Sequence, residues 1–210
     1  MPDSSQNIDP TLLQTVRDIA TLLGNRTAFT TQAFAAAEHF GPEAIVQLKT
    51  LYHDDPMPPE ECSGQFAALG SWLSARQFAI FEIYYHLGCA ALPELRRVAF
   101  GENDWTQGNA LEILCRLAAA GIDQERILEE IKCATADFRE EAIMYAMGPL
   151  VSYEPTTPGL REVLTALRQD TNWDWAYHHA LSAHQEQQRN SLLRQAEFAH
   201  MKQKPWWKFW

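Results

Sequence analysis

The sequence lacks the features by which membrane, secreted and many catalytic proteins are recognised. No run of apolar residues approaches the ~20 that cross a bilayer. The stretch Met1–Ser5 is polar and has neither the basic nor the apolar region of a secretory signal, so we expect a cytoplasmic protein. A glycine-rich phosphate loop, a GxSxG motif and an HExxH motif are also absent. We therefore expect no cofactor, no metal and no enzymatic activity.

Cysteine is scarce, with four residues in a chain of 210. The four are Cys62, Cys89, Cys115 and Cys133. They form no CxxC motif and no Cys/His ligand pair, so they show no metal-binding or redox pattern. Apolar neighbours, as in Leu114–Cys115, lead us to expect reduced and mostly buried thiols.

Basic residues are few and unevenly spread. Residues 1–188 hold 12 Lys and Arg against 26 Asp and Glu, a net charge of −14, whereas residues 189–210 hold five against one, a net charge of +4. Nucleic-acid binding requires a clustered basic surface that neutralises phosphates. The acidic charge of residues 1–188 therefore argues against a nucleic acid as the partner.

The chain is rich in hydrophobic residues, and these recur at helical spacing. Hydrophobic residues make up 46% of the 210 residues, which suits one compact domain or at most two small ones. Asp9–Pro10 predicts a helix start, and apolar residues at helical spacing follow until Gly24. Residues 76–87 are apolar almost all round, which predicts a central helix packed on several sides. Further helices are expected over 28–40, from Pro42 onward and over 60–70, with a proline-rich loop between the last two.

The second half of the chain repeats a pattern of one short and one long helix. The short helices are expected at 93–98, 124–131 and 158–164, and each long helix is expected to open with Asp and an aromatic residue. These pairs are Asp104–Trp105, Asp137–Phe138 and Asp174–Trp175, and the aromatic residues recur at spacings of 33 and 37. We expect the Asp to cap the helix, the aromatic ring to fill the seam to the next repeat, and a following Ala to allow close helix packing.

This pattern resembles the HEAT-like family of α-helical repeats over about residues 92–185. The resemblance implies an all-α fold of stacked antiparallel helix pairs, a HEAT-like α-solenoid that is irregular over residues 1–91. The Pro and Arg that often mark such repeats are irregularly placed here, so another α-solenoid or an irregular helical bundle stays open. We thus expect a helical repeat domain at 1–188 and a basic, aromatic tail at 189–210.

A small, acidic, HEAT-like chain looks like the bacterial immunity proteins that neutralise a cognate toxin, often a basic nuclease. On this interpretation the chain is a protein-binding module, and its acidic doublets align into a strip that steers a basic partner. For any single doublet, a solvent-exposed position on a helix surface is the simpler explanation. The doublets chosen as candidate partner-binding residues are Asp54 and Asp55, Glu129 and Glu130, and Glu140 and Glu141.

Four aromatic residues in the last five complete the candidate partner-binding set. They are Trp206, Trp207, Phe209 and Trp210. The tail can dock on the acidic body, bind another protein, or lie at a membrane interface, where Trp and Lys are both favoured. We favour the first two because anionic lipid would repel the acidic body. The alternative function is then a scaffold or adaptor tethered by this tail. Before the tail, polar residues 182–191 predict that the last helix either projects into solvent or breaks.

An enzyme is the third interpretation. Glu82 lies inside the most apolar helix, where burial would raise its pKa and suit it to general acid catalysis, although a structural contact with Arg76, Tyr84 or a backbone amide is the simpler expectation. His178 and His179 point about 100° apart on a helix, so a surface pair between Asp174 and His178 is favoured over a metal or hydrolase site.

Overall fold

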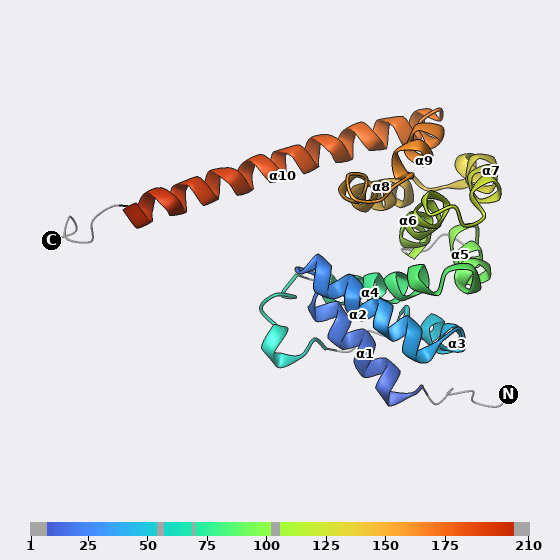
Figure 1. The fold of residues 1–210 in the computed structure, drawn as a ribbon, viewed down its shortest axis with the longest axis horizontal. Coiled ribbons are helices and arrows are strands. Elements are labelled where there is room, and N and C mark those ends of the chain that lie inside the picture. The colour runs from blue at the N-terminus through green and yellow to red at the C-terminus, as the bar shows by residue number, and fades with distance from the viewer. Residues whose placement is uncertain (1–7, 54–56, 69, 102–105, 204–210) are drawn as a thin grey trace.

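The computed structural model describes residues 8–53, 57–68, 70–101 and 106–203, and the side chains of these ranges up to residue 195. Most of this part is helical and it contains no strand, so the expected all-α fold class is confirmed. Figure 1 shows α1–α4 on one side of the molecule, α6–α9 stacked beside them, and α10 extending away from the rest. None of the helices in the described ranges is long and apolar enough to cross a membrane.

The N-terminal part is organised around one buried helix. Its elements are α1 (Pro10–Thr21), α2 (Arg26–Phe40), α3 (Ala44–Leu48), η1 (Lys49–Leu51), η2 (Glu60–Cys62) and α4 (Ser71–Leu87). The predicted start of α1 is confirmed, because the Asp9 side chain accepts a hydrogen bond from the Thr11 amide at 2.8 Å. The predicted central helix is also confirmed, since α4 packs against α1, α2 and α6.

The helix expected over 60–70 is wrong. Only the single turn η2 forms there, followed by turns and bends. Phe66 is the one buried side chain among the described residues of this stretch. Without an apolar stripe to bury, a short helix gains too little from packing to offset its nucleation cost.

The C-terminal part alternates short and long helices. Its elements are η3 (Gly88–Ala91), α5 (Leu92–Ala99), α6 (Thr106–Ala119), α7 (Gln124–Ala134), η4 (Thr135–Asp137), α8 (Glu140–Tyr153), α9 (Leu160–Leu167) and α10 (Thr171–Gln203). The long helix α6 packs on α8, α8 packs on α10, and the short helices α7 and α9 contact each other. Helix α6 also contacts α4, α5 and α9, so it joins the two parts of the molecule.

The expected Asp caps are wrong for two of the three long helices, and Asp104 lies outside the described residues. Asp137 falls in η4, and α8 begins only at Glu140 because Phe138 is extended. Helix α10 begins one turn early, since Asp170 accepts a hydrogen bond from the Asn172 amide at 2.8 Å. Asp170 is as good a capping residue as Asp174, and spacing alone could not choose between them.

The aromatic residues expected to fill the seams between repeats do so only in part. Phe138 stacks on Phe100 with ring centroids 6.1 Å apart, whereas Trp175 is half exposed and stacks on His179. The neighbouring Trp173 is the fully buried ring. Positions 173 and 175 lie about 200° apart around a helix, so only one of the two rings can face the core. Trp105 lies outside the described residues.

The thiols are less buried than expected. All four cysteines are free, but Cys115 is the buried one, while Cys89 and Cys133 are exposed and Cys62 is intermediate. Apolar sequence neighbours do not determine burial here, because a helix turns adjacent residues to different faces.

The approach of α6 to α8 requires a glycine. A Cβ atom at Gly108 would lie 2.8 Å from the Ala142 carbonyl oxygen and 2.8 Å from the Tyr145 Cβ atom. We expect Gly108→Ala to lower the free energy of unfolding by about 1–2 kcal/mol, although Ala favours helix by up to about 1 kcal/mol. Gly148→Ala on α8 is the matched control, since open space surrounds it and the same change should stabilise slightly. Urea unfolding measures both, and equal effects at the two sites would contradict the close-packing argument.

Helix α10 continues far beyond the body (Figure 1). Its first turns pack on α8, and the side chains of residues 185–195 are all exposed. The last helix therefore projects rather than breaks, as one of the two alternatives predicted. Leu192 and Leu193 are 65% and 53% exposed on this projecting segment.

Candidate functional site

The most buried helix of the described chain is also unexpectedly polar. Every side chain of α6 from Thr106 to Ala118 is buried. Among them are Asn109, Glu112 and Arg116, which lie three and four residues apart and so share one face of the helix. This spacing inside an otherwise apolar segment is visible in the sequence, and our sequence analysis missed it.

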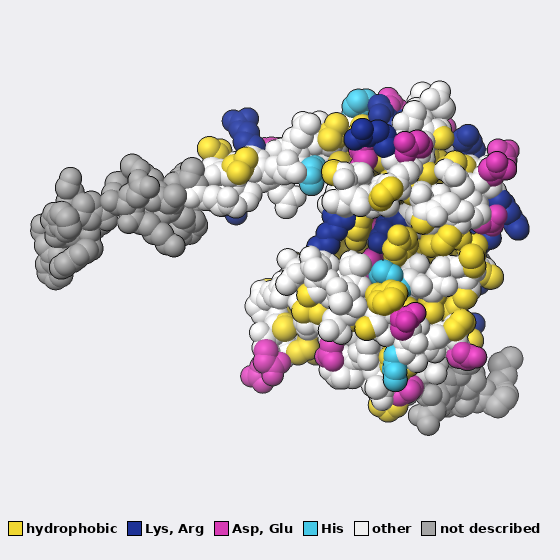
Figure 2. Space-filling view, in the orientation of Figure 1, with side chains coloured by type: hydrophobic (Ala, Val, Ile, Leu, Met, Phe, Trp, Pro, Cys, Tyr) yellow, Lys and Arg dark blue, Asp and Glu magenta, His cyan; other side chains and the backbone are white. Residues whose placement is uncertain are grey.

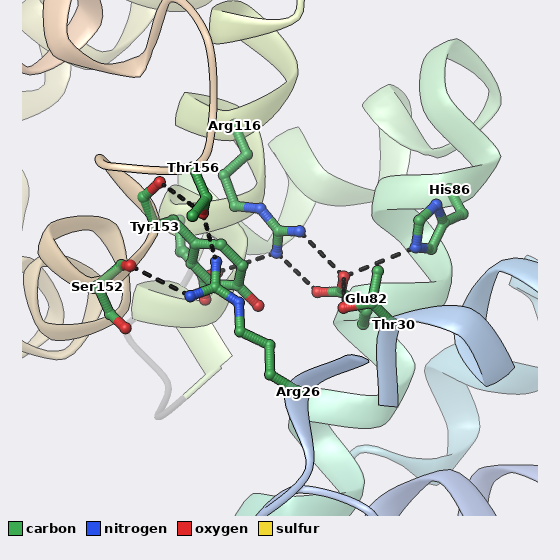
Figure 3. A network of polar contacts seen from close by, with 9 residues as sticks. Arg26, Thr30, Glu82, His86, Arg116, Ser152, Tyr153 and Thr156 are labelled. Carbon is green, nitrogen blue, oxygen red and sulfur yellow. Dashed lines mark hydrogen bonds and ion pairs between the residues drawn. The ribbon is translucent and has the colours of Figure 1, made fainter. Parts of the chain in front are cut away.

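A buried ion pair joins α6 to α4. The Arg116 guanidinium donates to both carboxylate oxygens of Glu82, with Nη1–Oε2 2.7 Å and Nη2–Oε1 3.0 Å. Both side chains are at most 4% exposed. Thr30 on α2 donates to the same carboxylate at 3.3 Å, and His86 Nε2 lies 3.6 Å away (Figure 3). The pair is bidentate, which is the strongest arrangement of an arginine and a carboxylate.

The environment of Glu82 corrects the expectation of a raised pKa. Burial by itself raises this pKa, but the contacts with His86 and Arg116 outweigh burial and lower the pKa of Glu82 to about 2. A carboxyl group that is ionised throughout the neutral range cannot act as a general acid there. Its principal partner is Arg116, which none of the contacts expected from the sequence had included.

Glu112 lies beside this pair and behaves in the opposite way. Burial raises the pKa of Glu112 to about 7, because the Arg116 charge compensates it only in part and Glu82 adds repulsion. Its Oε1 accepts a hydrogen bond from Arg116 Nη1 at 3.1 Å. No hydrogen bond from any described residue reaches its Oε2. Glu112 is therefore close to half protonated at neutral pH.

Aromatic rings and guanidinium groups surround the ion pair. The Arg116 Cζ atom lies 4.0 Å from the ring centroids of both Tyr85 and Tyr153. Arg26, at the start of α2, also lies over the Tyr153 ring, with its Cζ atom 3.6 Å from the centroid. Its Nη1 donates to the Ser152 carbonyl oxygen at 3.1 Å, as Figure 3 shows. These contacts tie the start of α2 to the end of α8, across the hollow between the two parts of the chain.

A pocket of about 220 Å³ opens beside this network. It is lined by Leu23, Arg26, Phe29, Phe78, Glu82, Glu112, Pro149, Ser152 and Tyr153. These residues come from α2, α4, α6 and α8 and from the loop before α2. Figure 2 shows the hollow between the two parts of the molecule, with Lys or Arg side chains inside it. Apolar walls with a few convergent polar groups are typical of a ligand site.

Of the acidic doublets, Glu129–Glu130 lies on α7 and is partly neutralised. Glu130 accepts from Arg96 Nε at 2.6 Å and from Arg126 Nε at 2.9 Å, and it is only partly exposed. Glu129 is exposed and accepts a weak hydrogen bond from Cys133 at 3.5 Å. Of this doublet, only Glu129 is exposed and outside an ion pair with a described residue.

Glu140 and Glu141 form the first turn of α8 and are both exposed. Neither forms an ion pair with a described residue, and Glu140 lines a small pocket together with Trp175 on α10. An acidic surface in this region would thus depend on Glu129, Glu140 and Glu141. Asp54 and Asp55, and the tail residues Trp206, Trp207, Phe209 and Trp210, lie outside the described residues.

The two histidines of α10 do not form a joint site. His178 Nε2 lies 3.7 Å from Asp174, which is the surface pairing expected from the sequence. It also lies 3.2 Å from an Arg168 nitrogen, which was not expected. His179 points elsewhere and stacks on the Trp175 ring at 5.6 Å.

Comparison with protein-family models, with curated proteins and with solved structures found no match.

Proposed function

We propose that this chain is a cytoplasmic protein-binding module whose acidic outer surface docks a basic protein. In its most specific form, the proposal is an immunity protein that covers and inhibits a basic toxin such as a nuclease. The interaction is with protein and not with nucleic acid, because the surface repels phosphates.

The observation that carries this proposal is how the arginines are used. Six of them form ion pairs with carboxylates of the same chain: Arg96, Arg97, Arg116, Arg126, Arg161 and Arg168. Many acidic side chains are exposed and form no ion pair with a described residue, including Glu38, Glu43, Glu60, Glu61, Glu125, Glu129, Glu140, Glu141 and Glu162. Each pair neutralises one arginine with one carboxylate, so the exposed carboxylates outside these pairs leave the surface acidic.

Such a surface acts mainly on the rate and specificity of association. Complementary charge raises the association rate constant well above that of neutral surfaces, and salt screens the effect. A basic partner would therefore bind quickly at low ionic strength, while neutral or acidic proteins would be rejected.

The packing of the C-terminal helices supports a HEAT-like arrangement. Short helices α5, α7 and α9 alternate with long helices α6, α8 and α10, and each long helix packs on the next. Stacked helix pairs of this kind present extended surfaces, which repeat proteins use for binding. On this proposal, the exposed acidic groups of α7 and α8 belong to one docking face.

The test is binding to a basic protein encoded beside this chain. We expect a 1:1 complex by size-exclusion chromatography with light scattering, and loss of the toxin's activity on its substrate when the chain is added in equal amount. A complex that forms without inhibition would leave protein binding in place and overturn the immunity function. Failure to bind any such neighbour would contradict both.

Charge reversal locates the docking face. The double variant Glu140→Lys/Glu141→Lys is expected to lower the association rate constant by about tenfold at low salt, with a smaller effect at high salt. The control Glu60→Lys/Glu61→Lys makes the same change in net charge at η2, and we expect it to have at most a small effect. Stopped-flow or surface-based kinetics measure both variants, and equal losses would show that net charge rather than a specific face drives association.

The projecting helix favours a second candidate function, a scaffold or adaptor. Residues 185–195 of α10 are exposed and include the apolar side chains Leu192 and Leu193. An isolated helix of this length is marginal in water and gains stability when a partner covers it. Removing residues 202–210 tests the tether: loss of vesicle binding with unchanged body stability would favour a membrane anchor over a protein partner.

A further inference from the structure

The pocket between α2, α4, α6 and α8 has the dimensions and walls of a site for a small molecule. Its volume of about 220 Å³ is below the ~300–1,000 Å³ of sites for drug-sized ligands, so it suits a compact ligand. Most of its lining is apolar, with the Phe29 and Phe78 side chains, Leu23 and Pro149 forming walls.

Among the arginines in and beside the pocket, Arg26 forms no ion pair with a described carboxylate, although its charge lowers the pKa of Glu112. Glu82 and Arg116 neutralise each other in the bidentate pair. Arg26 at the mouth contacts the Tyr153 ring, the Ser152 carbonyl oxygen and the Thr156 hydroxyl, at 3.6, 3.1 and 3.3 Å. None of these partners carries a negative charge, and the Arg26 Nε has no hydrogen bond to a described residue. The guanidinium is thus positioned, stacked and available to an anion.

The N-terminus of α2 also favours an anion at the mouth of the pocket. Leu23, Arg26 and Phe29 place the pocket mouth at the N-terminus of this helix of 15 residues. Asn25 caps it by accepting from the Ala28 amide, while the amides of Arg26 and Thr27 receive no such cap. Unpaired first-turn amides and the helix dipole both favour a negative charge at this end.

Glu112 supplies a hydrogen-bond donor deeper in the same pocket. It is 5% exposed, and its Oε1 is held by Arg116. When the group is protonated, the proton resides on Oε2, since Oε1 accepts from Arg116 and no described residue is hydrogen-bonded to Oε2. A protonated Glu112 therefore offers an O–H to a ligand and brings no negative charge against an anion.

We propose that this pocket binds a small organic monocarboxylate, with its carboxylate against Arg26 and its compact apolar body between the Phe29 and Phe78 side chains. This proposal does not rest on the binding of a protein partner. The single negative charge of the ligand would neutralise the positive charge of Arg26, which forms no ion pair with a described carboxylate.

Binding is linked to the protonation of Glu112. The titratable groups around it are Arg116 and Cys115 on α6, Glu82 on α4 with His86 beyond it, Arg26 on α2, and Tyr145 and Tyr153 on α8. Burial holds the pKa of Glu112 at about 7, so an anionic ligand meets a neutral carboxyl below this pH and a like charge above it. We expect affinity to fall about tenfold between pH 6 and pH 8, following the protonated fraction.

The experiment is calorimetric titration of the full chain with sodium benzoate and with benzylamine. Benzylamine carries a similar ring with a cation in place of the anion. We expect benzoate to bind with one-to-one stoichiometry and benzylamine not to bind. Tighter binding of benzylamine, or no binding of benzoate at millimolar concentration, would overturn the proposal.

Three variants make the test specific. Arg26→Gln is expected to weaken benzoate binding by at least about tenfold, while Arg126→Gln, which removes an exposed arginine on α7, leaves it unchanged. Glu112→Gln keeps a donor but cannot ionise, so it should retain benzoate binding and lose the pH dependence. If Glu112→Gln keeps the wild-type pH dependence, Glu112 is not the linked group, and that part of the proposal fails.

Discussion

Replacing Arg116 with methionine is expected to lower the free energy of unfolding by about 3–5 kcal/mol. The change leaves Glu82 without its bidentate partner and Glu112 without its hydrogen bond, in a site where both are at most 6% exposed. It also removes the cation between the Tyr85 and Tyr153 rings. A buried carboxylate that loses its cation keeps the cost of desolvation and loses the attraction that offset it.

Urea unfolding at neutral pH measures this effect, and two comparisons define it. Arg126→Met removes an arginine that is 67% exposed and pairs with Glu130, so it should cost at most about 1 kcal/mol. The double variant Glu82→Gln/Arg116→Met removes both charges, and we expect it to recover part of the loss. A loss of under about 1 kcal/mol in Arg116→Met would show that the pair is hydrated in solution and not a buried network.

The second large effect is an unusual dependence of stability on pH. Glu112 has a pKa of about 7 in the folded chain against 4.5 as its ordinary value. Between these values the folded state binds more protons than the unfolded state, so raising the pH favours unfolding. We expect the Glu112 contribution, about 3 kcal/mol, to be present below pH 4.5 and lost as the pH rises to about 7.

Glu82 has the opposite sign and a different pH window. Its pKa of about 2 lies below the ordinary 4.5, so its contribution is present above pH 4.5 and is lost as the pH falls toward 2. Together the two groups place maximum stability near pH 4.5 to 5, on the acidic side of neutrality.

Glu112→Gln isolates the first contribution. Other carboxylates also affect the pH dependence through repulsion, but they are the same in the variant and the wild type. We expect the variant's stability to change by about 3 kcal/mol less than the wild type's between pH 4.5 and pH 7. The free energy of unfolding at a series of pH values provides the measurement. Parallel curves for the two proteins would contradict the raised pKa of Glu112.

Local rules predicted local features well. Asp9 before Pro10 correctly marked the start of α1, because capping depends on neighbours in the chain. The nearly all-apolar run around Phe81 correctly indicated a helix packed on several sides. The same rules failed for the start of α10. Asp170 and Asp174 are both good capping residues, and in the structure Asp170 is the cap.

The candidate site could be predicted only in part. Glu82 drew attention because a carboxylate in an apolar helix is costly, and the structure confirms that it is buried. The predicted direction of the Glu82 pKa shift was wrong, because its partner Arg116 lies 34 residues away and no spacing rule connects them. Glu112 and Arg116 were missed, although their spacing on α6 was a readable signal.

By itself the sequence determined the helical fold class, the helices with clear apolar faces, and the division into an acidic body and a basic end. These properties follow from composition and from periodicity along the chain, which neighbouring residues set. The tertiary structure decided which charges are paired, which aromatic rings are buried, and where a pocket opens. Those outcomes depend on α2, α4, α6 and α8 meeting in space, where burial and a partner from another helix set the energy of each charge.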